Sequence, residues 1–291
     1  MSFAGKVALG RSRLLVSRIG LAPGRGGLPA REVERAFERG VNYLYWGSLR
    51  AASYREAIRA IGKRQREAMV LVVQSYSRSA RLMQSSLERA LRALHTDYAD
   101  LLLLGWWNQP PPPRLLDAAL ALRERGLARQ LMISCHDRST FQRYISEAAY
   151  GAIMVRYNAA HPGAEQDVFP HLPERDRPGV VAYTVTRWGG LIDPALAPSG
   201  ERMPTSTDCY RFALSSPSVD LCLSAPQTRA QLDQTLLTLD RGPMDADEIA
   251  WMKRVGAHVK ARATKRLLPS PLDVIDRLMA RFSGSPRDAT R

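Results

Sequence analysis

The stretch DYADLLLLGWW, residues 97–107, places four consecutive leucines between an acidic start and a glycine followed by two tryptophans. A continuous apolar run of this length is typical of a β-strand that is covered on both of its faces. Such strands occur in parallel sheets, because each crossover connection lays a helix on the sheet. The stretch therefore predicts a parallel α/β fold.

Seven further runs of strand length accompany it, separated by amphipathic stretches with helical spacing. The eight strand candidates span residues 18–21, 42–46, 69–74, 100–105, 130–135, 152–158, 179–185 and 220–225. Strands that alternate with helices predict βα units, and eight such units form a (β/α)8 barrel, the TIM barrel fold. A chain of 291 residues suits a single barrel, which we expect over residues 1–263.

The helical spacing is clearest in residues 80–94, where leucine and methionine side chains form one apolar stripe. Similar stripes run through residues 113–125, 140–149 and 228–239, the last with Thr228 as its N-cap. Residues 264–291 contain an amphipathic stretch and the polar end SGSPRDATR, which we expect to be a separate, partly disordered C-terminal segment.

The formal net charge of +14 would suit a nucleic-acid partner if the basic residues clustered on one face. The arginines are instead scattered along the chain, usually with a carboxylate nearby, as in Arg31 followed by Glu32. We therefore expect a solvated basic surface and no specific nucleic-acid partner.

No run of 18 apolar residues and no charged-then-apolar leader is present, so we expect a soluble cytoplasmic protein without a membrane partner. The three cysteines, Cys135, Cys209 and Cys222, are far apart and form no CxxC pair. We interpret them as reduced thiols, and we find no group of residues spaced to hold a metal ion.

Several segments occur in the order in which the bacterial aldo-keto reductases have them. They are ALGRSRLLVSRIGLA (8–22), GVNYLYWG (40–47), REAMVLVVQ (66–74), the opening stretch, GLARQLMIS (126–134), VRYNAAHP (155–162), VVAYT (180–184) and TRAQLDQTLLTLD (228–240). The chain resembles that family from residue 8 to about residue 257. The resemblance implies the same barrel fold.

The resemblance also implies a chemistry, namely hydride transfer from NADPH to a carbonyl. The family uses a tyrosine as the proton donor, a lysine that lowers its pKa, an aspartate that pairs with the lysine and a histidine that orients the carbonyl. Carried over by position, these four fall on Arg50, Gln74, Tyr45 and Gly105 respectively. Every one of the four is replaced.

The replacements differ in what they remove. Arg50 stays protonated and is a poor proton donor, and neutral Gln74 cannot lower the pKa of a nearby phenol. Loss of a general acid typically costs ~10² to 10⁴ in rate. Gly105 has no side chain, so we expect the pocket to be enlarged or reshaped at that position.

At the positions that bind the cofactor in the family, this chain has the family's residue at two places. Tyr183 falls where a tyrosine stacks on the nicotinamide ring, and Ser134 falls on the serine that holds its carboxamide. Asn158 matches the family's strand-six asparagine. Where the family grips the phosphates, this chain has Ala225, and Arg229 is the only nearby cation. NADPH is therefore a possible cofactor with a weak hold on its phosphates.

A pocket for a small-molecule ligand is expected at the carboxyl ends of the strands. Its expected lining is Tyr45, Trp46, Arg50, Gln74, Trp106, Trp107 and His136. His136 and Asp137 form either an acid/base pair or a surface hydrogen bond. Arg50, Arg156 and Arg187 either converge on an anionic ligand or lie on a solvated surface.

Three functional classes stay open. The first is a divergent NAD(P)-dependent oxidoreductase that acts on an activated substrate, favoured by the retained Tyr183 and Ser134. The second is an enzyme of another class, such as a lyase or isomerase. The third is a non-catalytic binding or regulatory protein, a pseudoenzyme, favoured by the loss of all four catalytic positions. The sequence leaves the ligand and the oligomeric state open.

Overall fold

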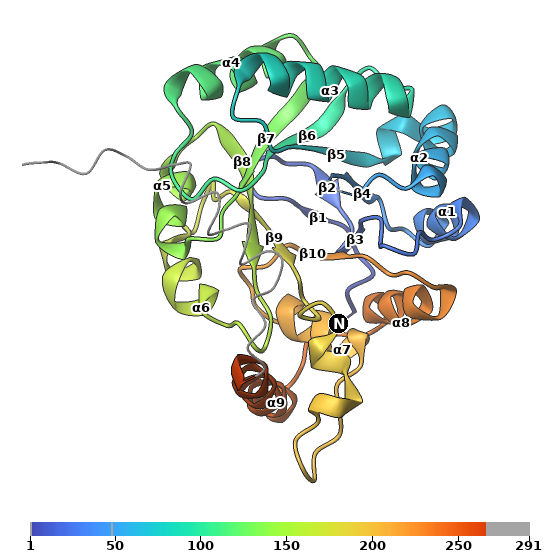
Figure 1. Ribbon diagram of the computed structural model, residues 1–291, viewed down its shortest axis with the longest axis vertical. Coiled ribbons are helices and arrows are strands. Elements are labelled where there is room, and N and C mark those ends of the chain that lie inside the picture. Colours follow the sequence, from blue (N-terminus) through green and yellow to red (C-terminus); the bar gives the residue numbers. More distant parts are fainter. Residues whose placement is uncertain (1, 48, 266–291) are drawn as a thin grey trace, which may run out of the picture.

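The computed structural model describes residues 2–47 and 49–265. At its centre, eight parallel strands close into a barrel, with the helices arranged around it (Figure 1). Around the ring, the strands are β3 (Ile19–Leu21), β4 (Tyr43–Trp46), β5 (Val70–Ser75), β6 (Ala99–Leu104), β7 (Ala128–Ser134), β8 (Tyr150–Arg156), β9 (Gly179–Tyr183) and β10 (Leu221–Ser224). All eight predicted strands and the (β/α)8 fold are confirmed.

Helices follow the strands and cover the outside of the ring. They are α1 (Ala30–Glu38), α2 (Ala52–Gln65), α3 (Ala80–Leu94), α4 (Pro113–Glu124), α5 (Phe141–Ser146), α6 (Ala164–Asp167), α7 (Ser206–Leu214), α8 (Arg229–Asp240) and α9 (Ala246–Lys265). None of these described helices combines the length and the apolar character that a membrane crossing requires. The predicted C-terminal segment lies outside the described residues apart from the end of α9.

The predicted helix limits are confirmed at 80–94. Thr228 is confirmed as the N-cap of α8, since its side chain accepts a hydrogen bond from the Gln231 amide, and the helix ends at Asp240, one residue later than predicted. The prediction for residues 140–149 is wrong at its end, because α5 stops at Ser146. Tyr150 is buried and already belongs to β8, so the chain must turn toward the barrel before that residue.

A short antiparallel hairpin of β1 (Val7–Ala8) and β2 (Leu15–Val16) lies at the amino ends of the barrel strands. Leu9 and Val16 are buried in the same apolar cluster as Val72 and Leu101, whose side chains fill the barrel. The hairpin therefore closes this end of the ring.

Strand alternation divides the apolar residues into two cores. Tyr43, Tyr45 and other alternate residues fill the barrel interior, whereas Leu44 and Trp46 pack in the layer between strands and helices. A strand that is buried on both faces needs apolar residues throughout, which explains its continuous apolar runs.

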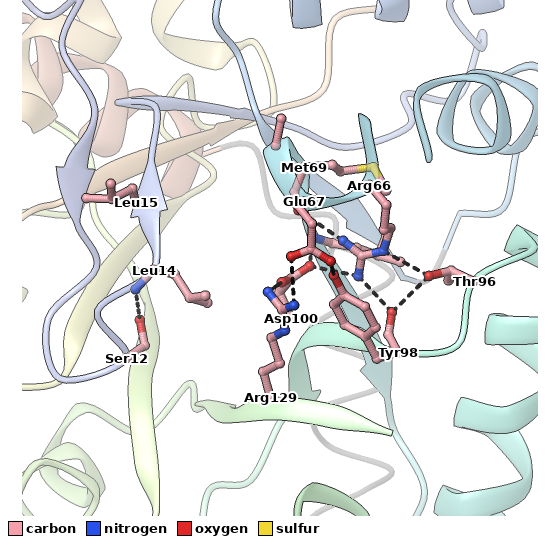
Figure 2. Close-up of polar contacts among 12 residues, drawn as sticks. Ser12, Leu14, Leu15, Arg66, Glu67, Met69, Thr96, Tyr98, Asp100 and Arg129 are labelled. Carbon is pink, nitrogen blue, oxygen red and sulfur yellow. Dashed lines mark hydrogen bonds and ion pairs between the residues drawn. The ribbon is translucent and has the colours of Figure 1, made fainter. Parts of the chain in front are cut away.

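Asp100, at the start of β6, joins three neighbouring strands at the amino end of the barrel (Figure 2). Its carboxylate accepts a hydrogen bond from the Leu71 amide at 2.9 Å and pairs with Arg66 at 2.9 Å and Arg129 at 3.3 Å. The ring of Tyr98 lies between the two guanidinium groups, 3.8 and 4.2 Å from their central carbons. Burial raises the pKa of Asp100, and the two arginines and the amide oppose that rise.

A second carboxylate repeats this arrangement on the other side of the ring. Asp220, just before β10, accepts a hydrogen bond from the Val180 amide at 2.7 Å and pairs through both oxygens with Arg177, at 2.6 and 2.9 Å. In both places, an aspartate at the start of one strand satisfies a backbone amide of the preceding strand.

Replacement of Asp100 tests how much this arrangement stabilises the barrel. We expect Asp100→Ala to lower the free energy of unfolding by about 3 kcal/mol, because breaking a buried ion pair leaves charges and a backbone amide without a partner. Asp100→Asn keeps an acceptor for the Leu71 amide and should cost less. Urea denaturation gives both values.

The matched control is Asp97→Ala, which removes an exposed carboxylate three residues earlier in the chain. We expect it to change the free energy of unfolding by less than about 0.5 kcal/mol. Equal losses in the Asp97 and Asp100 variants would show that the buried network does not stabilise the barrel.

Candidate functional site

The carboxyl ends of the eight strands, together with the loops that follow them, form the face that we call the mouth. Active sites of this fold lie at that face, because the loops after the strands can vary without disturbing the barrel. Tyr45, Gln74, Ser134 and Tyr183 all lie at or within one residue of the carboxyl end of a strand. The predicted site residues therefore do meet at one end of the fold.

Two of the expected pocket residues do not reach the mouth. The side chains of Trp46 and Trp107 are 3% and 7% exposed and belong to the core between barrel and helices. Trp46 follows Tyr45, so strand alternation turns its side chain outward. Trp107 lies under the guanidinium of Arg78, 3.9 Å from its central carbon. The prediction that these two tryptophans line the pocket is wrong.

Arg50, where the resemblance puts the family's tyrosine, lies on the surface. Its side chain is exposed and its Nε bonds back to the carbonyl oxygen of Gly47 at 3.4 Å. Whether Arg50 lines the pocket stays a prediction.

Of the two alternatives expected at Gly105, the structure shows a reshaped pocket and not an enlarged one. A Cβ atom added to Gly105 would collide with the Gln74 amide nitrogen and would lie 2.8 Å from the ring of Tyr76. The Tyr45 ring covers Gly47 in the same way. The space that a histidine would need is filled by neighbouring side chains.

Gln74 itself is 6% exposed, and its carbonyl oxygen is buried without a hydrogen-bond partner. A buried acceptor without a partner costs ~1–3 kcal/mol, so such atoms are uncommon in native proteins. Tyr45, at the aspartate position, is buried at 7% exposure within the barrel core. Neither residue offers the carboxylate or the ammonium group that the resemblance puts at these two positions.

The clearest feature of the mouth is the conformation of Trp106. Its φ of 61° lies in the left-handed region, which is an outlier for a bulky side chain. The Trp106 amide donates to Ser134 Oγ at 2.9 Å, and its carbonyl oxygen accepts from Arg78. Its ring stacks on His136, with ring centres 4.8 Å apart and planes inclined by 20°.

His136 links this stack to Tyr183, whose ring centre is 6.3 Å away. The backbone of the His136 loop is held by Asn108, whose side-chain oxygen accepts from the amides of His136 and Asp137 at 2.9 and 3.2 Å. The carboxylate of Asp137 accepts from the amide and hydroxyl of Ser139. Asp137 thus caps the following turn. Of the two alternatives expected for His136 and Asp137, these contacts match the surface hydrogen bond.

The predicted cofactor residues take different places. Ser134 is 7% exposed, and its hydroxyl already accepts a hydrogen bond from the Trp106 amide. Asn158 is fully buried, and its amide group bonds Thr184 O at 2.8 Å and the amides of Ala160 and His161 at 3.0 and 2.9 Å. The structure gives Asn158 a bracing role between the loops after β8 and β9.

At the expected phosphate end, Ala225 is exposed at the end of β10. Arg229 is 68% exposed and lies 3.8 Å from Asp233 in the next helical turn. The Gln227 amide donates to the Gln231 side chain at 2.7 Å. A phosphate at this end would need the guanidinium of Arg229 and the amide of Gln227, and both already have partners.

No pattern in the sequence identifies Arg78 and Asn108 as residues of the mouth. Arg78 bonds the carbonyl oxygens of Tyr76, Gly105 and Trp106, and it thereby ties the loop after β5 to the loop after β6. Within the described ranges, no group of three or more His, Cys, Asp or Glu side chains could hold a metal ion.

The structure is similar to those of several aldo-keto reductases. One from Bacillus halodurans, in its holo form, aligns with a TM-score of 0.73 and 21% identity over 87% of this chain and 96% of that chain. One from Klebsiella pneumoniae in complex with NADP and acetate has a TM-score of 0.69 and 20% identity over 87% and 96%. Another from Klebsiella pneumoniae, in complex with NADPH, has a TM-score of 0.68 and 22% identity over 87% and 95%.

No protein-family model and no curated protein sequence matches the chain. At these identities the likeness is one of fold. The chain has the fold of the aldo-keto reductases, as the resemblance of its segments predicts.

The filled space over Gly105 can be tested by Gly105→Ala. We expect a loss of ~1–3 kcal/mol in the free energy of unfolding, because the added methyl group overpacks against Gln74 and Tyr76. Gln74→Ala in the same chain should restore part of that loss, and urea denaturation of the double-mutant cycle measures the coupling.

Gly62→Ala provides the control, since a Cβ at Gly62 would meet only the Met69 methyl at an ordinary 3.7 Å. This change within α2 should stabilise the protein by up to about 1 kcal/mol through helix propensity. If Gly105→Ala behaves like Gly62→Ala, the mouth is open and not filled.

Proposed function

We propose that this chain is a ligand-binding barrel of aldo-keto reductase ancestry that holds a flat aromatic small molecule against Trp106, His136 and Tyr183. A nicotinamide ring is the first candidate. We further propose that the chain lacks the proton relay by which the family reduces carbonyls.

The observation that carries the proposal is the strained backbone of Trp106. A residue held in a sparsely populated conformation costs ~1–3 kcal/mol and persists only where its surroundings enforce it. Here Ser134 and Arg78 hold the Trp106 backbone while its ring stacks on His136, beside Tyr183. Strained backbone conformations are concentrated at ligand sites. A set of aromatic rings is suited to a planar ligand.

The four family positions support the absence of the proton relay. Tyr45 is buried in the barrel core, Gln74 is uncharged and Gly105 is covered, while Arg50 bonds to its own loop. Without a lysine, nothing at these positions lowers the pKa of a phenol toward neutrality. Reduction of an unactivated carbonyl would therefore lack its acid.

The fit of a nicotinamide cofactor is unequal at its two ends. Tyr183 offers a ring to the nicotinamide, and the Ser134 hydroxyl keeps a proton to donate while it accepts from Trp106. A bound nicotinamide would supply the hydride. At the phosphate end, Arg229 is exposed and lies beside Asp233, so a 2'-phosphate gains little there. We therefore propose weak binding of NADPH without preference over NADH.

A second candidate is a divergent oxidoreductase that acts on an activated substrate. It is favoured by His136, which lies beside Tyr183 and carries an imidazole, a group that can donate a proton near neutral pH. Turnover of NADPH with an activated carbonyl, lost in His136→Ala, would decide for this candidate.

Titration with NADPH and NADH, followed by nicotinamide fluorescence, tests the proposal. We expect saturable binding of both, with Kd values within about threefold of each other, because no dedicated cation distinguishes a 2'-phosphate. Tyr183→Ala should raise Kd by about tenfold or more, since a lost stacking contact is worth ~1–3 kcal/mol.

Tyr183→Phe is the matched control, because it keeps the ring and removes only the hydroxyl. It should bind the nicotinamide as the unchanged protein does. Failure of both cofactors to bind at millimolar concentration would exclude a nicotinamide, and equal binding by Tyr183→Ala would exclude the aromatic site.

A further inference from the structure

The neighbouring helices α2 and α3 carry an excess of positive charge. Together they contain seven lysines and arginines but only two acidic residues, Glu56 and Glu88. The adjacent α1 has two arginines and three glutamates. Figure 1 shows α2 and α3 side by side on the outside of the ring of strands. Cations that are scattered along the sequence therefore gather on one part of the barrel wall.

Three cations of α2 share one side of that helix. Arg55, Arg59 and Lys63 are four residues apart, so successive side chains start about 6 Å apart along the helix axis. Arg59 shows which way this side faces, because its Nε donates to the Ala93 carbonyl oxygen of α3 at 2.8 Å. The three cations therefore follow the line along which α2 meets α3.

A pocket of about 440 Å³ lies between the carboxyl ends of the two helices. Its lining consists of Arg59, Lys63 and His95, together with Ala60 and Gly62. His95 is the residue that ends α3, and its side chain is exposed. The surface is thus hollowed where basic side chains of both helices meet.

The outer side of α3 adds two more cations. Arg89 and Arg92 are both exposed, and their spacing of three residues puts them on the same side of the helix. We call Arg55, Arg59, Lys63, Arg89 and Arg92 together the α2–α3 face.

No cation of the α2–α3 face forms an ion pair with a carboxylate of the described residues. At the border of the face, Arg64 pairs with Glu34 of α1 at 2.7 Å, and Glu88 lies 3.6 Å from Arg125. Arg55 Nε is buried and has no hydrogen-bond partner. Like charges four residues apart destabilise a helix, so the stripe on α2 is unfavourable until an anion offsets it.

We propose that the α2–α3 face binds the sugar–phosphate backbone of a nucleic acid strand, without regard to base sequence. Four of its five cations are arginines, whose planar forks of donors match phosphate oxygens. The spacing of about 6 Å along α2 is close to the distance between neighbouring phosphates of an extended strand. Contacts to phosphates carry no sequence information, so this partner is a nonspecific one.

The side chains of the face favour a nucleic acid over a protein or a membrane. The core of a protein interface is apolar, and a helix that lies on a membrane inserts apolar side chains. Within α2 and α3, both of which the structure describes in full, the one exposed large apolar side chain is Leu82. It lies in the first turn of α3, at the other end from the pocket.

Fluorescence anisotropy of labelled RNA and DNA strands tests the face, with two unrelated sequences of each. We expect saturable binding that weakens as KCl rises from about 50 to about 200 mM, with a Kd of about 10⁻⁴ to 10⁻⁶ M near physiological salt. The two sequences should bind alike. The face lies outside the mouth, so this binding is measured independently of any nicotinamide.

The variant that removes part of the face is Lys63→Gln combined with Arg89→Gln. It should lower the affinity by about tenfold or more and flatten the slope of log K against log salt by about 1 to 2, because two phosphate contacts are lost. The control, Lys253→Gln combined with Arg254→Gln, removes the same charge from exposed positions of α9, on the opposite side of the barrel (Figure 1). It should keep the slope and the affinity. Equal losses in the two variants would overturn the proposal, because net charge alone would then explain the binding.

Acetylation of lysines in the unchanged protein, followed by mass spectrometry, gives a readout that needs no variant to fold. Saturating RNA should slow the acetylation of Lys63 several-fold and leave that of Lys253 unchanged, since only Lys63 belongs to the face. An unprotected Lys63 would overturn the proposal. Tighter binding of polyglutamate or of phosphatidylserine vesicles than of either nucleic acid would also overturn it, in favour of an acidic protein or a membrane surface.

Discussion

The fold depends on keeping eight parallel strands in register as they close into a ring. At the amino end, this task falls to buried carboxylates: Asp100 bonds the Leu71 amide of β5, and Asp220 bonds the Val180 amide of β9. Each carboxylate is compensated by arginines, which makes its burial tolerable. A charge that satisfies a neighbouring strand's backbone amide adds a directional constraint on the offset between the two strands.

The two ends of the barrel are consequently different in kind. The amino end is closed by the hairpin, and the buried carboxylates of Asp100 and Asp220 are paired there. The mouth holds a strained Trp106 and two buried polar atoms without a hydrogen-bond partner, the carbonyl oxygen of Gln74 and Arg187 Nε. Proteins concentrate such unfavourable features where a ligand can relieve them, and the stable end supplies the free energy that they cost.

Much of this follows from the sequence, and the exceptions have physical reasons. The continuous apolar runs predict the strands, and matched segments carry the family positions to Tyr45 and Gln74. The outward direction of Trp46 follows from strand alternation alone. Sequence alone does not predict that the space beside Gly105 is filled, because this depends on how Gln74 and Tyr76 pack across two loops. The role of Arg78 cannot be predicted either, because it bonds a carbonyl oxygen that is distant in the sequence, and no local pattern indicates such a bond.

The packing over Gly105 also limits the paths by which this chain can change. A side chain at position 105 is tolerated only after Gln74 has shortened or moved, and Gly47 is bound in the same way to the ring of Tyr45. The effect of a substitution at position 105 or 47 therefore depends on which residue is present at the contacting position, 74 or 45, and such dependence between positions is called epistasis.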